Sequence, residues 1–220
     1  MPRGLFVTGT DTGVGKTVVA ASVLHRYRQG QRLRYWKPIE TGVEADDDTA
    51  EVARLAECDD HELFRHGVRV QRPLSPHLAA RLSGCTIDVD VLLEAFLRED
   101  SDVCWIVEGA GGVLVPINDR ETMADLMVRL GLPVVIAART ALGTINQTLL
   151  TIEALRRRAL EVAGVVMVGH PDADTCEAIE GYGAVTILGQ MPMFTPLTVS
   201  ALATWAPQLD PEGRLLTCFQ

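Results

Sequence analysis

The feature of this sequence that most constrains its fold is a glycine-rich turn between an apolar run and an amphipathic stretch. Residues 9–17 are GTDTGVGKT, after the apolar run Leu5–Thr8 and before a helical pattern over Thr17–Gln29. Such a turn directs main-chain N–H groups inward at a helix N-terminus, where the helix dipole also favours an anion. The sequence therefore predicts a phosphate site in which Lys16 reaches the phosphates and the Thr17 hydroxyl can ligate magnesium. A turn that only joins a strand to a helix is the disfavoured alternative.

The loop departs from the common pattern G-x-x-x-x-G-K-[ST] at its first glycine. Thr10 stands at that position and Gly9 precedes it, so the loop is one residue longer than usual. The dinucleotide pattern G-x-G-x-x-G is not present here. Phosphate binding is thus predicted from the strand, the turn and the lysine together rather than from an exact motif match.

Short apolar runs alternate with amphipathic stretches along the whole chain. Several runs are apolar on both faces, which is typical of parallel strands covered by helices on each side. No internal repeat or linker divides the sequence. We therefore predict a single doubly wound α/β domain over residues 1–220, with a mostly parallel sheet and helices on both faces. The predicted strands are Leu5–Thr8, Leu33–Trp36, Val103–Val107, Val134–Ala138, Val162–Val168 and Val185–Leu188, and the predicted helices are Thr17–Gln29, Thr49–Glu57, Pro76–Leu82, Val89–Arg98, Met123–Leu130, Thr144–Arg158 and Cys176–Glu180.

Composition narrows the function classes. The net charge is −9, which argues against a broad electrostatic grip on nucleic acid or an anionic membrane. The five cysteines are scattered without a C-x-x-C pair, and no apolar run reaches the length of a membrane span. A cytoplasmic, reduced protein is the simplest expectation. Of the 20 basic residues only Lys16 and Lys37 are lysines, so their compact point charges deserve a specific explanation.

Three further segments place polar side chains near the predicted phosphate site. Lys37 follows the second predicted strand in KPIETG, and Glu108 follows the third in VEGAGG. Carboxyl ends of parallel strands meet at one sheet edge, where ligands bind in doubly wound folds. Lys37 is thus either a phosphoryl-facing cation or a solvated strand end, and Glu108 a magnesium ligand or a solvent-facing acid.

The acidic run 46–48 precedes the helical pattern over Thr49–Glu57. Asp48 is a good N-cap residue, and Glu51 would complete a capping box, worth on the order of 1 kcal/mol. A metal role for Asp48 is the rival interpretation, which the local sequence leaves open.

Five segments in order, GTDTGVGKT, KPIETG, DDDTAEV, VEGAGG and LGTINQTLLTIEAL, resemble the dethiobiotin synthetase family of biotin synthesis. They span most of the chain from Leu5 to about Gly169, and the lengthened phosphate loop is a feature of that family. The resemblance implies a phosphate-loop NTPase fold and an ATP-dependent ligase. Its substrates would be 7,8-diaminononanoate, CO2 and ATP, its cofactor Mg²⁺, and its assembly a homodimer.

The reaction implied by the resemblance begins when CO2 adds to an amine of the substrate as a carbamate. The carbamate attacks the γ-phosphate of ATP, giving a carbamic–phosphoric anhydride and ADP. The second amine then closes the cyclic urea and phosphate leaves.

The resemblance also assigns residues. The implied catalytic cations are Lys16 and Lys37, and the implied metal ligands are Thr17, Asp48 and Glu108. The implied nucleotide-binding residues are Gly13, Val14, Gly15, Lys16, Thr17, Val18, Asp48, Glu108, Gly109, Ala110, Gly111, Gly169 and His170. The implied substrate-binding residues are Thr12, Thr41, Gly111, Gly112 and Asn146, the last across the dimer interface. Many relatives carry an adenine-reading asparagine where this chain has Val168-Gly169-His170-Pro171, so the base preference is left open.

Other phosphate-loop classes fit less well. A GTPase would need an N-K-x-D motif with a third lysine, and a partitioning-type ATPase a second lysine early in the loop, where Asp11 and Thr12 stand. The amidating synthetases of cobalamin synthesis carry an additional glutaminase domain, for which 220 residues leave no room. A small-molecule kinase is the strongest alternative, because the phosphate loop alone would permit it.

Overall fold

The computed structural model of the protein describes residues 2–44 and 46–220, and its centre is a seven-stranded sheet with the order β4-β2-β6-β1-β7-β8-β9. Every pairing in this sheet is parallel. The fold-class prediction is therefore confirmed. The strands are β1 Arg3–Gly9, β2 Leu33–Trp36, β4 Leu63–Phe64, β6 Cys104–Gly112, β7 Val134–Arg139, β8 Val162–Val168 and β9 Ile187–Met191, and β3 Ile39–Thr41 pairs with β5 Val68–Val70 in a separate parallel ribbon.

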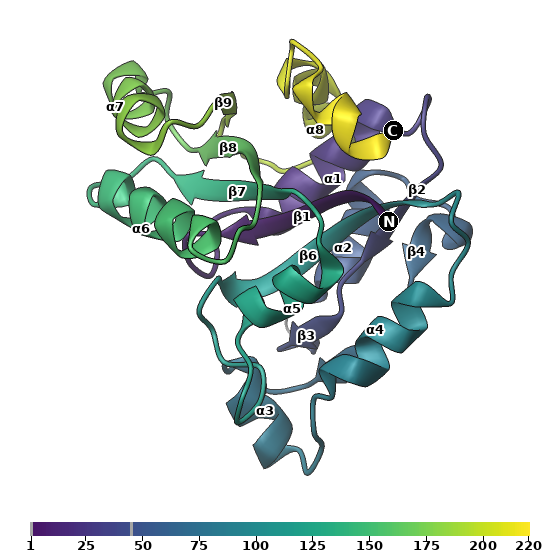
Figure 1. Ribbon diagram of the computed structural model, residues 1–220. Coiled ribbons are helices and arrows are strands. Elements are labelled where there is room, and N and C mark those ends of the chain that lie inside the picture. Colours follow the sequence, from purple (N-terminus) through teal and green to yellow (C-terminus); the bar gives the residue numbers. More distant parts are fainter. Residues whose placement is uncertain (1, 45) are drawn as a thin grey trace.

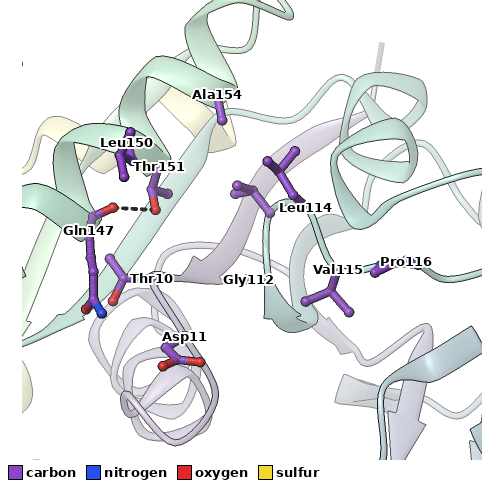
Figure 2. Close-up of a pocket in the computed structure, with 11 residues that line it drawn as sticks. Thr10, Asp11, Gly112, Leu114, Val115, Pro116, Gln147, Leu150, Thr151 and Ala154 are labelled. Atoms are coloured by element: carbon purple, nitrogen blue, oxygen red, sulfur yellow. Dashed lines mark hydrogen bonds between the residues drawn. The ribbon is translucent and has the colours of Figure 1, made fainter. Parts of the chain in front are cut away.

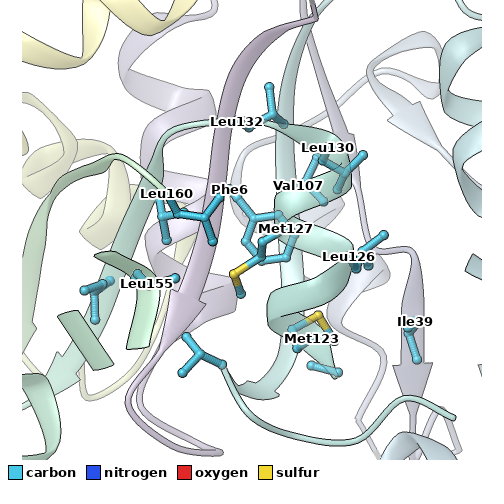
Figure 3. Packing of buried hydrophobic residues seen from close by; sticks show 14 of the residues in the cluster. Phe6, Ile39, Val107, Met123, Leu126, Met127, Leu130, Leu132, Leu155 and Leu160 are labelled. Carbon is cyan, nitrogen blue, oxygen red and sulfur yellow. The ribbon is translucent and has the colours of Figure 1, made fainter. Parts of the chain in front are cut away.

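Helices cover both faces of the sheet (Figure 1). Helices α1, α2 and α8 pack on one face through a cluster that includes Val19, Leu55 and Leu202. Helices α4 to α7 pack on the other face, where Phe6 and Met127 are buried at the centre of the cluster (Figure 3). The helices are α1 Lys16–Tyr27, α2 Asp48–Leu55, α3 Pro76–Leu82, α4 Val89–Leu97, α5 Met123–Leu130, α6 Thr144–Arg156, α7 Ala173–Gly183 and α8 Val199–Trp205, with 3-10 turns at Asp60–Glu62, Ala206–Gln208 and Arg214–Phe219.

The predicted elements are present, with shifts at some ends. Strand β9 begins at Ile187, which pairs with Val165, and ends at Met191, so it starts two residues later and ends three residues later than the predicted run Val185–Leu188. Helix α7 is longer than Cys176–Glu180 at both ends, and its first turn is capped by Asp172, which accepts from Thr175 N at 2.9 Å. Strands β3, β4 and β5 were not predicted, because two or three residues are too few for a periodic pattern. No helix within the described residues has the length and apolar character needed to cross a bilayer.

The sheet topology fixes where a ligand can bind. From β1 at the centre the chain moves to β2 and β4 on one side, and later to β7, β8 and β9 on the other. Because all strands are parallel, the turn after β1 and the ends of β2 and β6 meet at one edge. A ligand crevice is expected at such a reversal of strand order.

Candidate active site

The turn between β1 and α1 has the geometry of an anion site. Gly15 caps α1 with φ of 96°, a left-handed conformation that favours glycine. A side chain there would also meet the methyl groups of Val168, with a Cβ 3.2 Å from Cγ1. The exposed Gly13 likewise has φ of 69°. The main-chain N–H groups of residues 13–17 therefore lie at the N-terminus of a twelve-residue helix. This position favours the binding of a phosphate group.

A cavity of about 760 Å³ opens at this sheet edge. It collects the predicted residues of the phosphate loop together with Lys37, Asp48 and Glu108. Its lining includes Thr12, Gly13, Gly15, Lys16, Thr17, Val18, Lys37, Thr41, Asp48, Glu108, Ala110 and Gly111, along with Gly42, Asp46, Glu51, Val115, Leu197 and residues 73–76. Segments from Thr12 to Leu197 therefore meet in one site, because the parallel topology brings the carboxyl ends of the strands to one edge.

Lys37 joins the two carboxylates of the site. Its ammonium Nζ lies 2.6 Å from Asp48 Oδ2 and 2.7 Å from Glu108 Oε1, and it donates to the Gly109 carbonyl at 3.2 Å. Lys37 is only 6% exposed, so the alternative of a solvated strand end is wrong. Glu108 is fully buried rather than solvent-facing. Both side chains line the cavity, and their roles toward phosphate and magnesium stay predictions.

The two lysines have opposite electrostatic surroundings. Burial opposes the charge of Lys37, but Glu108 and Asp48 outweigh it and raise the pKa of this lysine. Burial lowers the pKa of Lys16, and the positive charge of Lys37 lowers it further. Among the described residues Lys16 makes no salt bridge, and its Nζ donates to the Asp11 carbonyl at 3.0 Å. Lys16 therefore lacks a carboxylate partner of its own, and a bound anion would stabilise its charge more than that of Lys37.

Thr17, Asp48 and Glu108 present oxygen atoms to one point. Thr17 Oγ1 lies 2.7 Å from Asp48 Oδ1 and 3.1 Å from Glu108 Oε1. Burial raises the pKa of the Asp48 carboxyl, but the Lys37 ammonium and the Thr17 hydroxyl outweigh this and hold it below its usual range, so the oxygens stay anionic. Magnesium prefers oxygen ligands and is commonly bound by one or two carboxylates together with substrate phosphates. These three side chains fit that ion.

The capping role expected of Asp48 is wrong. The N-cap of α2 is Asp47, whose Oδ1 accepts from Ala50 N at 2.8 Å, and Asp48 is the first residue of the helix. The capping box with Glu51 is not formed, and Glu51 instead pairs with Arg54 at 2.6 Å. Each of three consecutive aspartates could cap a helix, and only the path of the chain selects one. Asp48 is consequently free to face Thr17 and Lys37.

The remaining predicted residues lie outside the main cavity. Val14 is 1% exposed in the core, so only its main chain can face a phosphate. Gly169 and the exposed His170 follow β8, and Asn146 is exposed in the first turn of α6. At Gly169, which has φ of 138°, a Cβ would lie 2.2 Å from Thr140 Oγ1. Gly109 is placed at the edge of the site through its carbonyl contact with Lys37.

Figure 2 shows the residues that line a second cavity, of about 430 Å³. Val115 lines both cavities. On one side are Gly112 and the apolar residues that follow β6, and on the other are Gln147, Leu150, Thr151 and Ala154 of α6. Most of this lining is apolar, with Thr10 and Asp11 of the phosphate loop at one end. The predicted substrate residue Gly112 thus borders a largely apolar cavity whose lining suits an alkyl chain.

Some residues of the site were not predicted from the sequence. Tyr35 is fully buried, and its hydroxyl donates to Glu108 Oε2 at 2.8 Å. Burial raises the pKa of Tyr35 well above its ordinary value, and the charge of Glu108 adds to the effect, so the phenol remains a donor. No sequence signal marked Tyr35, since it lies inside an apolar strand. Glu40, Arg69 and Asp47 form a second unpredicted group, next to Asp48.

Comparison with known proteins supports the family that the sequence motifs resemble. A family model described as an AAA domain matches residues 3–201. The chain is 44% identical over 202 residues to the ATP-dependent dethiobiotin synthetase BioD of Agrobacterium fabrum, covering 92% of each protein. It is also 44% identical over 217 residues to the biotin biosynthesis bifunctional protein BioCD of Bordetella avium. That match covers 98% of this chain and 45% of the relative.

A solved structure confirms the fold class. The ParA family ATPase from Chlorobium tepidum superposes with a TM-score of 0.59 at 10% identity, covering 100% of this chain and 98% of that one. Such low identity shows a shared fold alone. The sequence relatives decide the family. The chain belongs to the family of ATP-dependent dethiobiotin synthetases.

Proposed function

We propose that this site carboxylates 7,8-diaminononanoate with CO2 and closes the cyclic urea at the expense of ATP. The observation that carries the proposal is the arrangement of Lys37 between Asp48 and Glu108, at 2.6 and 2.7 Å, beside a phosphate loop and an apolar cavity. The phosphate loop and the two lysines suit the phosphates of a nucleotide, and the adjoining apolar cavity suits an alkyl chain. Relatives named ATP-dependent dethiobiotin synthetases support this choice of reaction.

In this reaction the protein would act mainly by holding positive charges next to the reacting oxygen atoms. The carbamate attacks the γ-phosphorus, the bond to the ADP oxygen breaks, and the phosphoryl group joins the carbamate oxygen. Lys16 and Lys37 would stabilise the negative charge that shifts among these oxygens. Attack of the second amine on the anhydride carbon then expels phosphate and forms the ring.

We propose that Mg²⁺ is held by Thr17, Asp48 and Glu108. The ion would neutralise charge on the phosphate oxygens of ATP. Tyr35 and Lys37 would keep the Glu108 carboxyl group oriented while it serves as a ligand. Thr12, Thr41 and Gly111 line the same cavity and are proposed to contact the substrate.

The first prediction concerns substrate dependence. Release of phosphate from ATP should require both the diamine and bicarbonate, because the carbamate is the attacking group. The measurement is phosphate release with each component omitted in turn, together with the mass of the product. Rapid turnover without bicarbonate that yields a phosphorylated ligand would support the kinase alternative instead.

We propose that the protein is a homodimer that pairs through the face around α6. Leu142 is fully exposed just before α6, and Leu150 and Leu114 are 56% and 54% exposed at the second cavity. Such a group of apolar side chains is typical of an interaction surface. Asn146 in the first turn of α6 would then meet the substrate carboxylate bound by the partner, where the free N–H groups and the helix dipole favour an anion.

This arrangement gives the second prediction. Leu142→Glu should convert the dimer to monomer and reduce activity, since it places a charge at a surface from which water is excluded. Light scattering at the assay concentration measures the assembly. Leu97→Glu is a matched control, because Leu97 is 69% exposed at the end of α4. A fully active monomer would contradict the shared site.

We further propose that residues 1–220 act as one domain and that the protein is cytoplasmic. The first proposal rests on the continuous central sheet, which spans β1 to β9. The second rests on the cysteines, which are free at all five positions and scattered in the sequence.

A further inference from the structure

A buried acidic residue, Glu40, docks the helix that carries Asp48. Glu40 belongs to β3 and is 1% exposed. Its Oε1 accepts from Thr49 N at 3.1 Å, and its Oε2 accepts from Thr49 Oγ1 at 3.2 Å. Thr49 is the second residue of α2, so this main-chain N–H is one of the first-turn donors that a helix cannot satisfy internally. The carboxylate therefore holds the start of α2 by its main chain, next to Asp48.

Arg69 connects this carboxylate to the true cap of the helix. Arg69 is paired in register with Glu40 across the ribbon of β3 and β5. Its guanidinium lies 3.1 Å from Glu40 Oε2 and 2.6 Å from Asp47 Oδ2. Arginine suits this position because its planar fork can reach two carboxylates at once with fixed geometry. Glu40 and Asp47 thus accept from adjacent main-chain N–H groups of α2, and the two carboxylates share the single positive charge of Arg69.

Because Glu40 and Asp47 bind the first-turn N–H groups of α2, the Asp48 carboxylate is available to the site. Asp47 accepts from Ala50 N and Glu40 from Thr49 N, so Asp48 has no capping task. Asp48 points instead to Thr17 Oγ1 at 2.7 Å and Lys37 Nζ at 2.6 Å. We propose that Glu40 and Arg69 are positioning residues that hold the first turn of α2 so that the Asp48 carboxylate faces the metal site. The inference rests on the proposed magnesium role of Asp48 and extends it to the residues behind it.

The experiment measures metal binding and local order separately from turnover. Glu40→Gln keeps the shape and one acceptor but removes the charge that pairs with Arg69. We expect affinity for Mn²⁺, used with ADP as a spectroscopic probe, to fall about tenfold, since partners behind a metal ligand typically contribute 10- to 100-fold. In the metal-free protein, amide exchange at Thr49 and Ala50 should become faster. Calorimetry or electron paramagnetic resonance gives the affinity, and hydrogen exchange gives the order.

Two arginine variants and a matched control complete the design. Arg69→Gln should reproduce both effects, and because Arg69 is partly exposed, this variant keeps the test valid if Glu40→Gln folds poorly. Arg69→Lys should lose less affinity, since it retains the charge without the fork. Arg54→Gln breaks the exposed Glu51–Arg54 pair on the same helix and should change neither measurement.

The outcomes separate this inference from the proposed reaction. Unchanged Mn²⁺ affinity in both Glu40→Gln and Arg69→Gln would overturn the positioning role, as would lower thermal stability with unchanged affinity and unchanged exchange at Thr49. Neither measurement requires turnover. A protein that makes no cyclic urea but shows the expected binding losses would contradict the reaction and leave the positioning role standing.

Discussion

Replacing Lys37 with glutamine is expected to lower kcat by about 100- to 1000-fold, or roughly 3–4 kcal/mol in activation free energy, with a much smaller loss of nucleotide binding. Charge moves from the γ-phosphate to the carbamate oxygens during the proposed reaction. An ammonium fixed between Asp48 and Glu108 stabilises that developing charge more than it stabilises bound substrate. Steady-state kinetics and nucleotide titration together measure the two effects.

The same substitution is also expected to destabilise the protein. Lys37 is 6% exposed and Glu108 is fully buried, so glutamine would leave a buried carboxylate without its cation. Breaking such a pair from one side typically costs about 3–5 kcal/mol. A solvated strand-end lysine could be replaced without this loss, so the cost follows from the burial of the pair. Thermal denaturation should therefore accompany the kinetics.

A second substitution separates catalysis from stability. Lys37→Arg keeps the positive charge beside Glu108 and Asp48, so it should retain more stability than Lys37→Gln. It should nevertheless recover little activity, because a planar fork cannot occupy the place of a compact ammonium. Lys16→Gln should weaken nucleotide binding as well as turnover. Activity within a few-fold of the parent in a folded Lys37→Gln variant would remove Lys37 from the mechanism.

The principal side chains of this site could be predicted from the sequence because their meeting place depends only on the sheet topology. Lys37 and Glu108 each follow an apolar run, and Lys16 follows a glycine-rich turn. Once the sheet is parallel, these positions meet at one edge whatever the exact strand ends are. The lysine count added a second line of argument, since both lysines of the chain line the main cavity.

Contacts that depend on the exact pairing register of the strands could not be predicted from the sequence. Glu40 stands inside KPIETG, yet its partner Arg69 belongs to β5, a three-residue strand with no periodic pattern. Tyr35 is one residue of an apolar strand, and its contact with Glu108 depends on which face of β2 it occupies. The acidic run 46–48 predicted a helix start correctly but not which aspartate caps it. Such choices are decided by packing between distant segments, which local propensity does not encode.

Replacing Asp48 with asparagine is expected to raise the magnesium concentration for half-maximal activity by on the order of 100-fold or more, since partners that only support a metal ligand already contribute about 10- to 100-fold. Asparagine keeps an oxygen near Thr17 but loses the charge that attracts the ion. The helix itself should persist, because Asp47 rather than Asp48 caps α2 and Glu40 binds Thr49 N. Magnesium titrations of activity and of nucleotide binding measure the effect.

A control variant tests whether the loss is local. Asp60→Asn removes the same charge from a side chain that is 96% exposed in the 3-10 turn after α2, and it should keep the parent magnesium requirement. Thermal stability of Asp48→Asn should fall by less than that of Lys37→Gln, because Lys37 retains Glu108 as a partner when Asp48 is neutral. A normal magnesium requirement in a folded Asp48→Asn variant would assign Asp48 to the neutralisation of Lys37 alone. Glu108 and Thr17 would then be the only protein groups proposed to hold the ion.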